Sequence, residues 1–160
     1  MRCVLLCFTF LTSMNVHATD CFDRAGRDYH IDPDLLRAIA LRESSMKPHA
    51  INFVGPDNYA IGEMQIHSHN FLSLSRLGIT PYDLYNNQCL NIYTGAYYLA
   101  IAFNRWGVNW NSVGAYNAGF KKNRAQAKIR FNYAAKVYAT YTVIKHEKSI
   151  ISPPVNLGPH

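Results

Sequence analysis

Apolar residues recur along this chain at intervals of three and four, and no segment alternates convincingly with the two-residue period of a strand. The spacing predicts helices over 20–29, 33–44, 68–77, from 81 onwards, 89–105, about 112–118 and 130–144. Between 46 and 61 we expect a long surface loop, because Pro48, Gly55-Pro56 and Asp57-Asn58 interrupt the pattern there. The pattern therefore predicts an all-α, mainly helical fold in a single domain.

Local signals support several of these helices. Asp32-Pro33 and Thr80-Pro81 each place an N-cap residue directly before a proline, which suits the first helical position. The helix over 89–105 carries apolar and small residues at helical spacing: Ile92, Gly95, Ala96, Leu99 and Phe103. We expect it to be the central core helix, since small residues permit close packing.

Glu43 lies in line with an apolar stripe near the end of its predicted helix. Leu36, Ile39, Ala40 and Glu43 are spaced so that all four share one helix face. A carboxyl in this position would be partly desolvated, which raises its pKa and lets it hold a proton near neutral pH. The alternative is that the helix frays and Glu43 faces water. Periodicity alone leaves both interpretations open.

The two ends of the chain differ in character from the middle. Residues 1–18 have an early Arg2, an apolar run and a Val-His-Ala end, which together are typical of a cleaved signal peptide. The run is too short to cross a bilayer, so we expect no stable membrane insertion. Residues 145–160 contain three prolines and predict a flexible tail. The expected domain is therefore 19–144, in a periplasmic protein.

Two cysteines, Cys21 and Cys89, follow the predicted cleavage site. An oxidising compartment favours one disulfide between them, and two unpaired buried thiols are the alternative.

The chain is basic, with a formal net charge of +6. An exported basic protein is attracted to anionic cell-wall polymers or membrane surfaces. Charge alone would also allow nucleic acid, but the basic residues are scattered apart from Lys121, Lys122 and Arg124, and an export signal disfavours DNA binding. We therefore expect no nucleic-acid partner, and a monomer.

Three separated segments carry polar groups within apolar surroundings: Glu43-Ser44, Gly62 to Ile66 and Ala115 to Gly119. Their carboxyl, amide and hydroxyl groups suit a saccharide, which offers hydroxyl and N-acetyl groups together with apolar faces.

These segments, in this order and spacing, resemble the goose-lysozyme-like lytic transglycosylases. The resemblance extends from about Cys21 to Tyr141. It is greatest to the small specialised members encoded with conjugative transfer, type IV pilus and type III secretion systems. Those members share Cys21, the Asn91 to Ala96 segment and the Trp110 to Gly119 segment.

The resemblance implies a lysozyme-like fold that cleaves the β-1,4 bond between N-acetylmuramic acid and N-acetylglucosamine. Glu43 would protonate the glycosidic oxygen and then accept the proton of the muramic acid 6-hydroxyl, which closes a 1,6-anhydro ring. No metal or other cofactor is implied. The implied partners are peptidoglycan strands and components of a secretion, pilus or conjugation apparatus.

The resemblance also assigns supporting roles. Ser44 would position Glu43 or the sugar, and Tyr133 would lie beside the catalytic carboxyl. Substrate contacts would come from residues of the two other motifs, namely Met64, Gln65, Tyr116 and Asn117.

One position departs from the family pattern, because Glu63 stands where the family usually has an apolar residue. We favour a solvent-facing side chain on a short turn. The alternative is a second carboxylate in the cleft, which would raise the pKa of Glu43 further and permit lysozyme-like hydrolysis.

His67 and His69 would point to different sides of a helix, and no third ligand stands at a usual spacing, so we expect no metal.

A non-catalytic wall-binding or assembly module and a DNA-binding protein are the rival hypotheses for the function of this chain. Glu43 favours the enzyme, since a binding module has no need of an acid on a core stripe.

Overall fold

A computed structural model describes residues 20–151. Its helices are α1 (Cys21–Tyr29), α2 (Pro33–Ser44), the 3₁₀ turn η1 (Ser68–Asn70), α3 (Phe71–Ser75), α4 (Pro81–Asn86), α5 (Gln88–Trp106), α6 (Trp110–Ala118) and α7 (Arg124–Ile151). Three short strands, β1 (Ile51–Gly55), β2 (Asn58–Ile61) and β3 (Ile66–His67), form an antiparallel sheet in that order. The mainly helical fold predicted from the sequence is confirmed.

Side-chain caps fix the helix starts. Asp32 accepts a hydrogen bond from the backbone N–H of Asp34 at 2.8 Å, with Pro33 at the first helical position. Thr80 and Asp83 form a reciprocal capping box at the start of α4. The sequence predicted these two starts from Asp32-Pro33 and Thr80-Pro81, without the partner Asp83.

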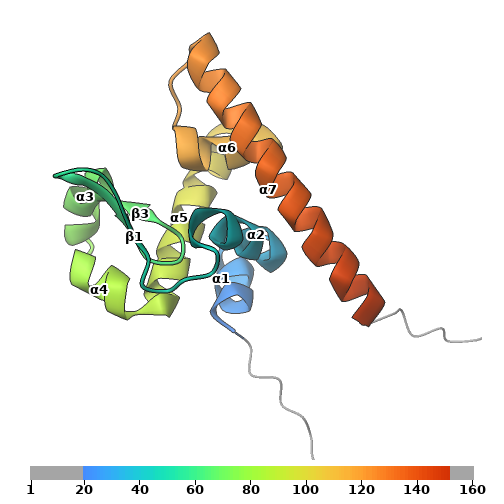
Figure 1. The fold of residues 1–160 in the computed structure, drawn as a ribbon, viewed down its shortest axis with the longest axis horizontal. Coiled ribbons are helices and arrows are strands. Elements are labelled where there is room, and N and C mark those ends of the chain that lie inside the picture. Colours follow the sequence, from blue (N-terminus) through green and yellow to red (C-terminus); the bar gives the residue numbers. More distant parts are fainter. Residues whose placement is uncertain (1–19, 152–160) are drawn as a thin grey trace, which may run out of the picture.

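Helix α5 lies at the centre of the molecule (Figure 1), between α1 on one side and α6 on the other. Its residues Ile92, Ala96 and Leu99 are almost completely buried, as the helical spacing predicted. Long helix α7 packs across α6 and α2. A disulfide joins Cys21 of α1 to Cys89 of α5, so the pairing expected from the two cysteines is formed.

The sheet corrects the prediction of an irregular loop over 46–61. β1 and β2 pair as a hairpin around Pro56 and Asp57, and β3 adds the third strand. The first four residues of β1 are all exposed. A strand without a buried face has no reason to alternate apolar and polar residues, and this is why the pattern did not reveal it.

Helix α7 corrects the prediction of a tail from residue 145, because the helix continues to Ile151. Its last turns are tied to the start of α2. Lys145 lies 3.3 Å from Asp32, and Lys148 donates to Asp34, whose side chain is buried. The sequence pattern of residues 145–151 could not reveal this extension of the helix, because the ion pairs that hold it are made to residues far away in the chain. The predicted signal peptide, 1–18, lies outside the described residues.

None of the helices between residues 20 and 151 combines the length and apolar character needed to cross a bilayer.

Candidate active site

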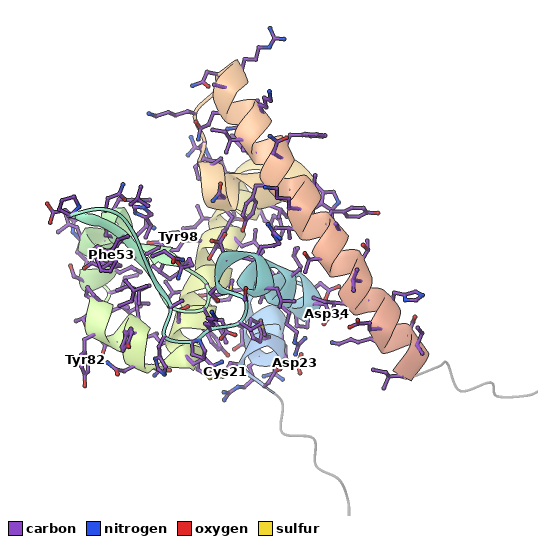
Figure 2. All side chains as sticks on the ribbon, viewed as in Figure 1. Cys21, Asp23, Asp34, Phe53, Tyr82 and Tyr98 are labelled. Atoms are coloured by element: carbon purple, nitrogen blue, oxygen red, sulfur yellow. A yellow bond between two sulfur atoms is a disulfide. The ribbon has the colours of Figure 1, made fainter. Side chains whose placement is uncertain are left out.

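A cleft of about 610 Å³ lies beside the sheet, with the end of α2, the middle of α5 and the α6 segment on its other sides. Figure 2 shows Tyr98 projecting from α5 towards the sheet, and this ring is part of the cleft wall. The three segments singled out from the sequence all contribute to it. The lining includes Glu43, Asn52, Gln65, His67, His69, Tyr98, Ala115, Tyr116, Asn117, Gly119 and Phe120.

Glu43 occupies the last turn of α2 and is half-buried. The Tyr133 hydroxyl, from α7, donates a hydrogen bond of 2.5 Å to its Oε1. Burial raises the pKa of Glu43, while the Tyr133 hydrogen bond and the charge of Arg42 oppose that rise in pKa. The carboxyl is thus a half-buried acid at the cleft, partly desolvated as the apolar stripe predicted, and not a group on a frayed helix end.

Ser44 explains why α2 ends cleanly at this point. Its buried hydroxyl donates to the Glu63 carbonyl at 2.8 Å and accepts from the Lys47 N–H at 3.1 Å. The two residues that follow, Ser45 and Met46, both have positive φ angles, 55° and 61°, so the chain turns sharply away. Ser44 therefore holds the end of α2 against the Gly62 to Ile66 segment.

The Gly62 to Ile66 segment is a tight turn anchored from below by Asn91 of α5. The fully buried Asn91 amide donates to the Ile61 carbonyl at 3.0 Å and accepts from the Met64 N–H at 2.8 Å. Gln65 has a φ of 50°, in the left-handed region. Asn91 was noted in the sequence only as part of a shared segment, although a polar residue on a core stripe was a usable signal.

Met64 has a different role from the one expected. Its side chain has no exposed surface and packs against Gly95 of α5, beneath the cleft and not on its wall. Its backbone carbonyl instead accepts a 2.7 Å hydrogen bond from the Tyr116 hydroxyl. The buried Met64 side chain thus anchors the turn in the core, and the Met64 carbonyl positions Tyr116.

Gln65 and Asn117 lie where a sugar could reach them. Gln65 Nε2 donates to the Gly62 carbonyl at 2.8 Å, and its Oε1 accepts from Asn52 Nδ2 at 2.8 Å. Asn117 is exposed on the cleft wall at the end of α6. Asn52, on a strand that the sequence pattern missed, was not predicted.

Glu63 follows neither of its two predicted interpretations. Its side chain is 1% exposed, so it does not face solvent, and it does not line the cleft. One carboxylate oxygen accepts a 2.8 Å hydrogen bond from Gln88 Nε2 at the start of α5. Among the described residues that line the cleft, Glu43 is the one acidic side chain.

His67 and His69 lie side by side at the cleft rim, contrary to the prediction that they diverge. His67 ends β3 and His69 lies in η1, so the chain turns between them and brings the two Nδ1 atoms to 2.7 Å. The pKa of His69 is lowered, mainly because the ring is partly buried and to a smaller extent because of the neighbouring His67. Within residues 20–151 no three His, Cys, Asp or Glu side chains gather as a metal site.

Comparisons with known proteins agree with this geometry. The Transglycosylase SLT domain family matches residues 20–139. The chain is 53% identical over 148 residues to X polypeptide of Escherichia coli K12, covering 92% of this chain and 87% of the relative. It is 36% identical to Invasion protein IagB of Salmonella typhimurium, covering 85% and 84%.

A solved structure extends the comparison to the fold. The X-ray structure of an inactive mutant of lytic transglycosylase Slt from Pseudomonas aeruginosa superposes with a TM-score of 0.62 at 25% identity. The match covers 89% of this chain and 25% of the Slt chain, so it concerns about a quarter of that protein. It confirms the lysozyme-like fold expected from the sequence. The chain belongs to the transglycosylase SLT domain family and is a peptidoglycan lytic transglycosylase.

Proposed function

We propose that Glu43 alone serves as acid and base in cleaving the bond between N-acetylmuramic acid and N-acetylglucosamine, with a 1,6-anhydro product. The observation that carries this proposal is the isolation of Glu43. It is the single acidic group on the described cleft wall, half-buried and with a raised pKa. A carboxyl whose pKa is raised by burial holds its proton to higher pH than an exposed one, and this suits it to act first as an acid.

In the first step the protonated Glu43 donates its proton to the glycosidic oxygen. The bond from that oxygen to the anomeric carbon of muramic acid breaks, and N-acetylglucosamine leaves with a free 4-hydroxyl. Tyr133 holds Oε1, so Oε2 is the oxygen available to carry the transferred proton. Positive charge develops at the anomeric carbon as the bond breaks.

In the second step the Glu43 carboxylate accepts the proton of the muramic acid 6-hydroxyl. The 6-oxygen attacks the anomeric carbon of the same sugar and closes the 1,6-anhydro ring, which returns Glu43 to its protonated form. Water is not consumed. Glycosidases that use water rely on a second carboxylate as base or nucleophile. The position of Glu63, outside the cleft lining, supports the intramolecular route over lysozyme-like hydrolysis.

The remaining polar groups of the cleft are proposed to hold the sugars. Gln65, Tyr116 and Asn117 contribute amide and hydroxyl groups around Glu43. Ser44 and Tyr133 are proposed to act as positioning residues. Ser44 fixes the end of α2, and Tyr133 fixes the Glu43 carboxyl.

We further propose that the protein is exported to the periplasm with cleavage after Ala18, and that it opens the wall locally for a conjugation or secretion apparatus. The support is the signal-like pattern of residues 1–18 and the similarity to IagB, named as an invasion protein.

The test of the catalytic assignment is zymography on peptidoglycan with Glu43→Gln. This change keeps the size and the hydrogen bond from Tyr133 but removes the proton. We expect clearing to fall by roughly 10²–10⁴-fold, the usual contribution of a general acid. Glu63→Gln is the matched control, because it alters a buried carboxyl outside the cleft and should leave clearing largely intact wherever the protein folds. Wild-type clearing by Glu43→Gln would contradict the proposal.

A further inference from the structure

The net positive charge of this chain is concentrated in its second half, because acidic residues are scarce there. From residue 84 to residue 146 there is no Asp or Glu, while the same stretch contains Arg105, Lys121, Lys122, Arg124, Lys128, Arg130, Lys136 and Lys145. The catalytic proposal uses none of them. Part of this charge gathers in one place.

A surface hollow of about 560 Å³ lies where α6 leads into α7. Figure 1 shows the start of α7 rising above the rest of the molecule at this point. The described lining contains three cations and no acidic residue: Trp106, Asn111, Lys122, Asn123, Arg124, Ala127 and Arg130. The first turn of a long helix adds the positive end of its dipole to the same region.

Arg130 is the unusual member of this group, because it is only 5% exposed. Its Nε donates to Asn111 Oδ1 at 3.2 Å, and its Nη1 donates to the carbonyls of Gly119 at 3.2 Å and Lys121 at 3.0 Å. The guanidinium also lies 5.0 Å from the centre of the Trp106 ring. None of the described carboxylates forms an ion pair with it.

Arg37 offers a comparison within the same molecule. This partly buried arginine forms ion pairs with Asp20, Asp23 and Asp34. Burial of a charge is costly unless an opposite charge or strong hydrogen bonds compensate. Arg130 has neutral acceptors alone, beside two further cations, so an anion in the hollow would supply the missing charge.

The hollow and the glycan cleft share one wall. Gly119 and Phe120 line the cleft, the Gly119 carbonyl accepts from Arg130, and the Phe120 ring lies 5.0 Å from the Trp106 ring. A ligand that extends from a sugar in the cleft would therefore meet the hollow. The muramic acid of peptidoglycan can carry such an extension, namely a peptide with free carboxylates attached to its lactyl group.

We propose that this hollow binds the carboxylates of the peptide stem carried by the glycan. The inference rests on the proposed function, since it takes the cleft as the glycan site. Lys122 and Arg124 reach the peptide from the rim, and Arg130 supplies the buried charge. The hollow thereby favours stem-bearing strands over bare glycan.

The experiment compares two substrates, intact peptidoglycan strands and strands freed of their peptides by an amidase. The variant is Lys122→Ala/Arg124→Ala, which leaves the packed Arg130 in place. Lys128→Ala/Lys136→Ala is the matched control, because it removes the same charge from exposed positions outside the hollow. We expect KM for stem-bearing strands to rise about tenfold in the first variant, with kcat and bare-strand cleavage unchanged.

Binding is measured separately with Glu43→Gln protein and free stem peptide, so the result does not depend on cleavage. We expect the rim substitutions to weaken this binding about tenfold and the control substitutions to have no such effect. An equal loss on both substrates, or no loss on either, would overturn the proposal. A loss confined to binding of phosphatidylglycerol vesicles would also overturn it and assign the hollow to membranes. Absence of cleavage with peptide binding intact would count against the proposed function alone.

Discussion

At the scale of single residues, the pKa of Glu43 is raised by burial and lowered by its neighbours, the Tyr133 hydroxyl and Arg42. The acid must keep its proton to start the reaction, yet must release it within the same turnover. An intermediate pKa serves both steps, because the efficiency of an acid–base catalyst is greatest when its pKa lies near the working pH.

Tyr133→Phe tests this balance. The ring is kept, and the hydrogen bond that lowers the Glu43 pKa is removed, so that pKa rises. Since the first step needs protonated Glu43, activity is lost as pH rises through this pKa, and the alkaline limb of the pH–rate profile should move to higher pH. We also expect kcat to fall by about tenfold or more, because a hydrogen bond to a charged group contributes roughly 1.5–3 kcal/mol.

Tyr138→Phe is the control for this measurement. Tyr138 lies on the same helix, but its exposed ring packs against Trp110, with the ring centres 4.9 Å apart, and the hydrogen bond to Glu43 comes from Tyr133. Its removal should leave the profile in place. An alkaline limb that stays fixed in Tyr133→Phe, or moves to lower pH, would show that Tyr133 does not tune the acid.

At the scale of elements, α5 is the platform on which the site rests. Asn91 holds the turn that carries Gln65, and Gly95 leaves room for Met64. A Cβ built on Gly95 would lie 2.6–2.8 Å from Met64 side-chain atoms. The placement of the cleft wall therefore depends on Gly95, although alanine is normally the more favourable residue inside a helix.

Gly95→Ala should thus be destabilising despite its better helix propensity. We expect the free energy of unfolding to fall by about 1–3 kcal/mol, as is typical of overpacking. Activity should fall as well, because displacement of Met64 moves the carbonyl that orients Tyr116. Urea denaturation and zymography measure the two effects.

Gly55→Ala is the comparison for this variant. A Cβ there would meet only Asn58, at an ordinary 3.8 Å. Stability and clearing should both stay near wild type. If Gly95→Ala behaved in the same way as Gly55→Ala, the close packing of Met64 would not constrain the site.

The sequence predicted elements where local rules agree with the tertiary structure. Helices with a cap and an apolar stripe, such as α2 and α5, were recovered nearly to the residue. The exposed strand β1 left no alternation to detect, and the last turns of α7 depend on ion pairs to Asp32 and Asp34. Glu43 was singled out because an acid on a core stripe is a conflict visible in the sequence itself, and the family resemblance then favoured a catalytic acid over a frayed helix end.

The neighbours of Glu43 were less predictable. Resemblance pointed to Tyr133 and Tyr116, and the structure shows Tyr133 on the carboxyl and Tyr116 on the Met64 carbonyl. The burial of Met64 and Glu63 could not be read from a motif, because both residues stand in a turn between Gly62 and Gln65, which have positive φ angles of 79° and 50°.

At the scale of the whole molecule, the Cys21–Cys89 disulfide joins the first helix to the central one across 68 residues of chain. We expect the double variant Cys21→Ser/Cys89→Ser to lose about 4 kcal/mol of unfolding free energy, because the unfolded chain regains the entropy of an open loop. The measurement is the urea midpoint at constant slope. Addition of a reductant to the wild type should reproduce the shift, and an unchanged midpoint in both cases would contradict this role.

The glycan cleft and the basic hollow meet at the α6–α7 junction, so the whole molecule presents a neutral sugar site beside an anion site. Helix α7 contributes to both, through Tyr133 at the acid and Arg130 at the hollow. This shared helix is the physical basis for expecting that one substrate, a peptide-bearing glycan, occupies both.

The most direct test of the central claim, that Glu43 acts alone and without water, is mass spectrometry of the products released from purified peptidoglycan. The account predicts muropeptides that end in 1,6-anhydro-muramic acid, lighter by one water than reducing ends, and no such products from Glu43→Gln. Reducing ends as the main product, with oxygen incorporated from labelled water, would contradict it.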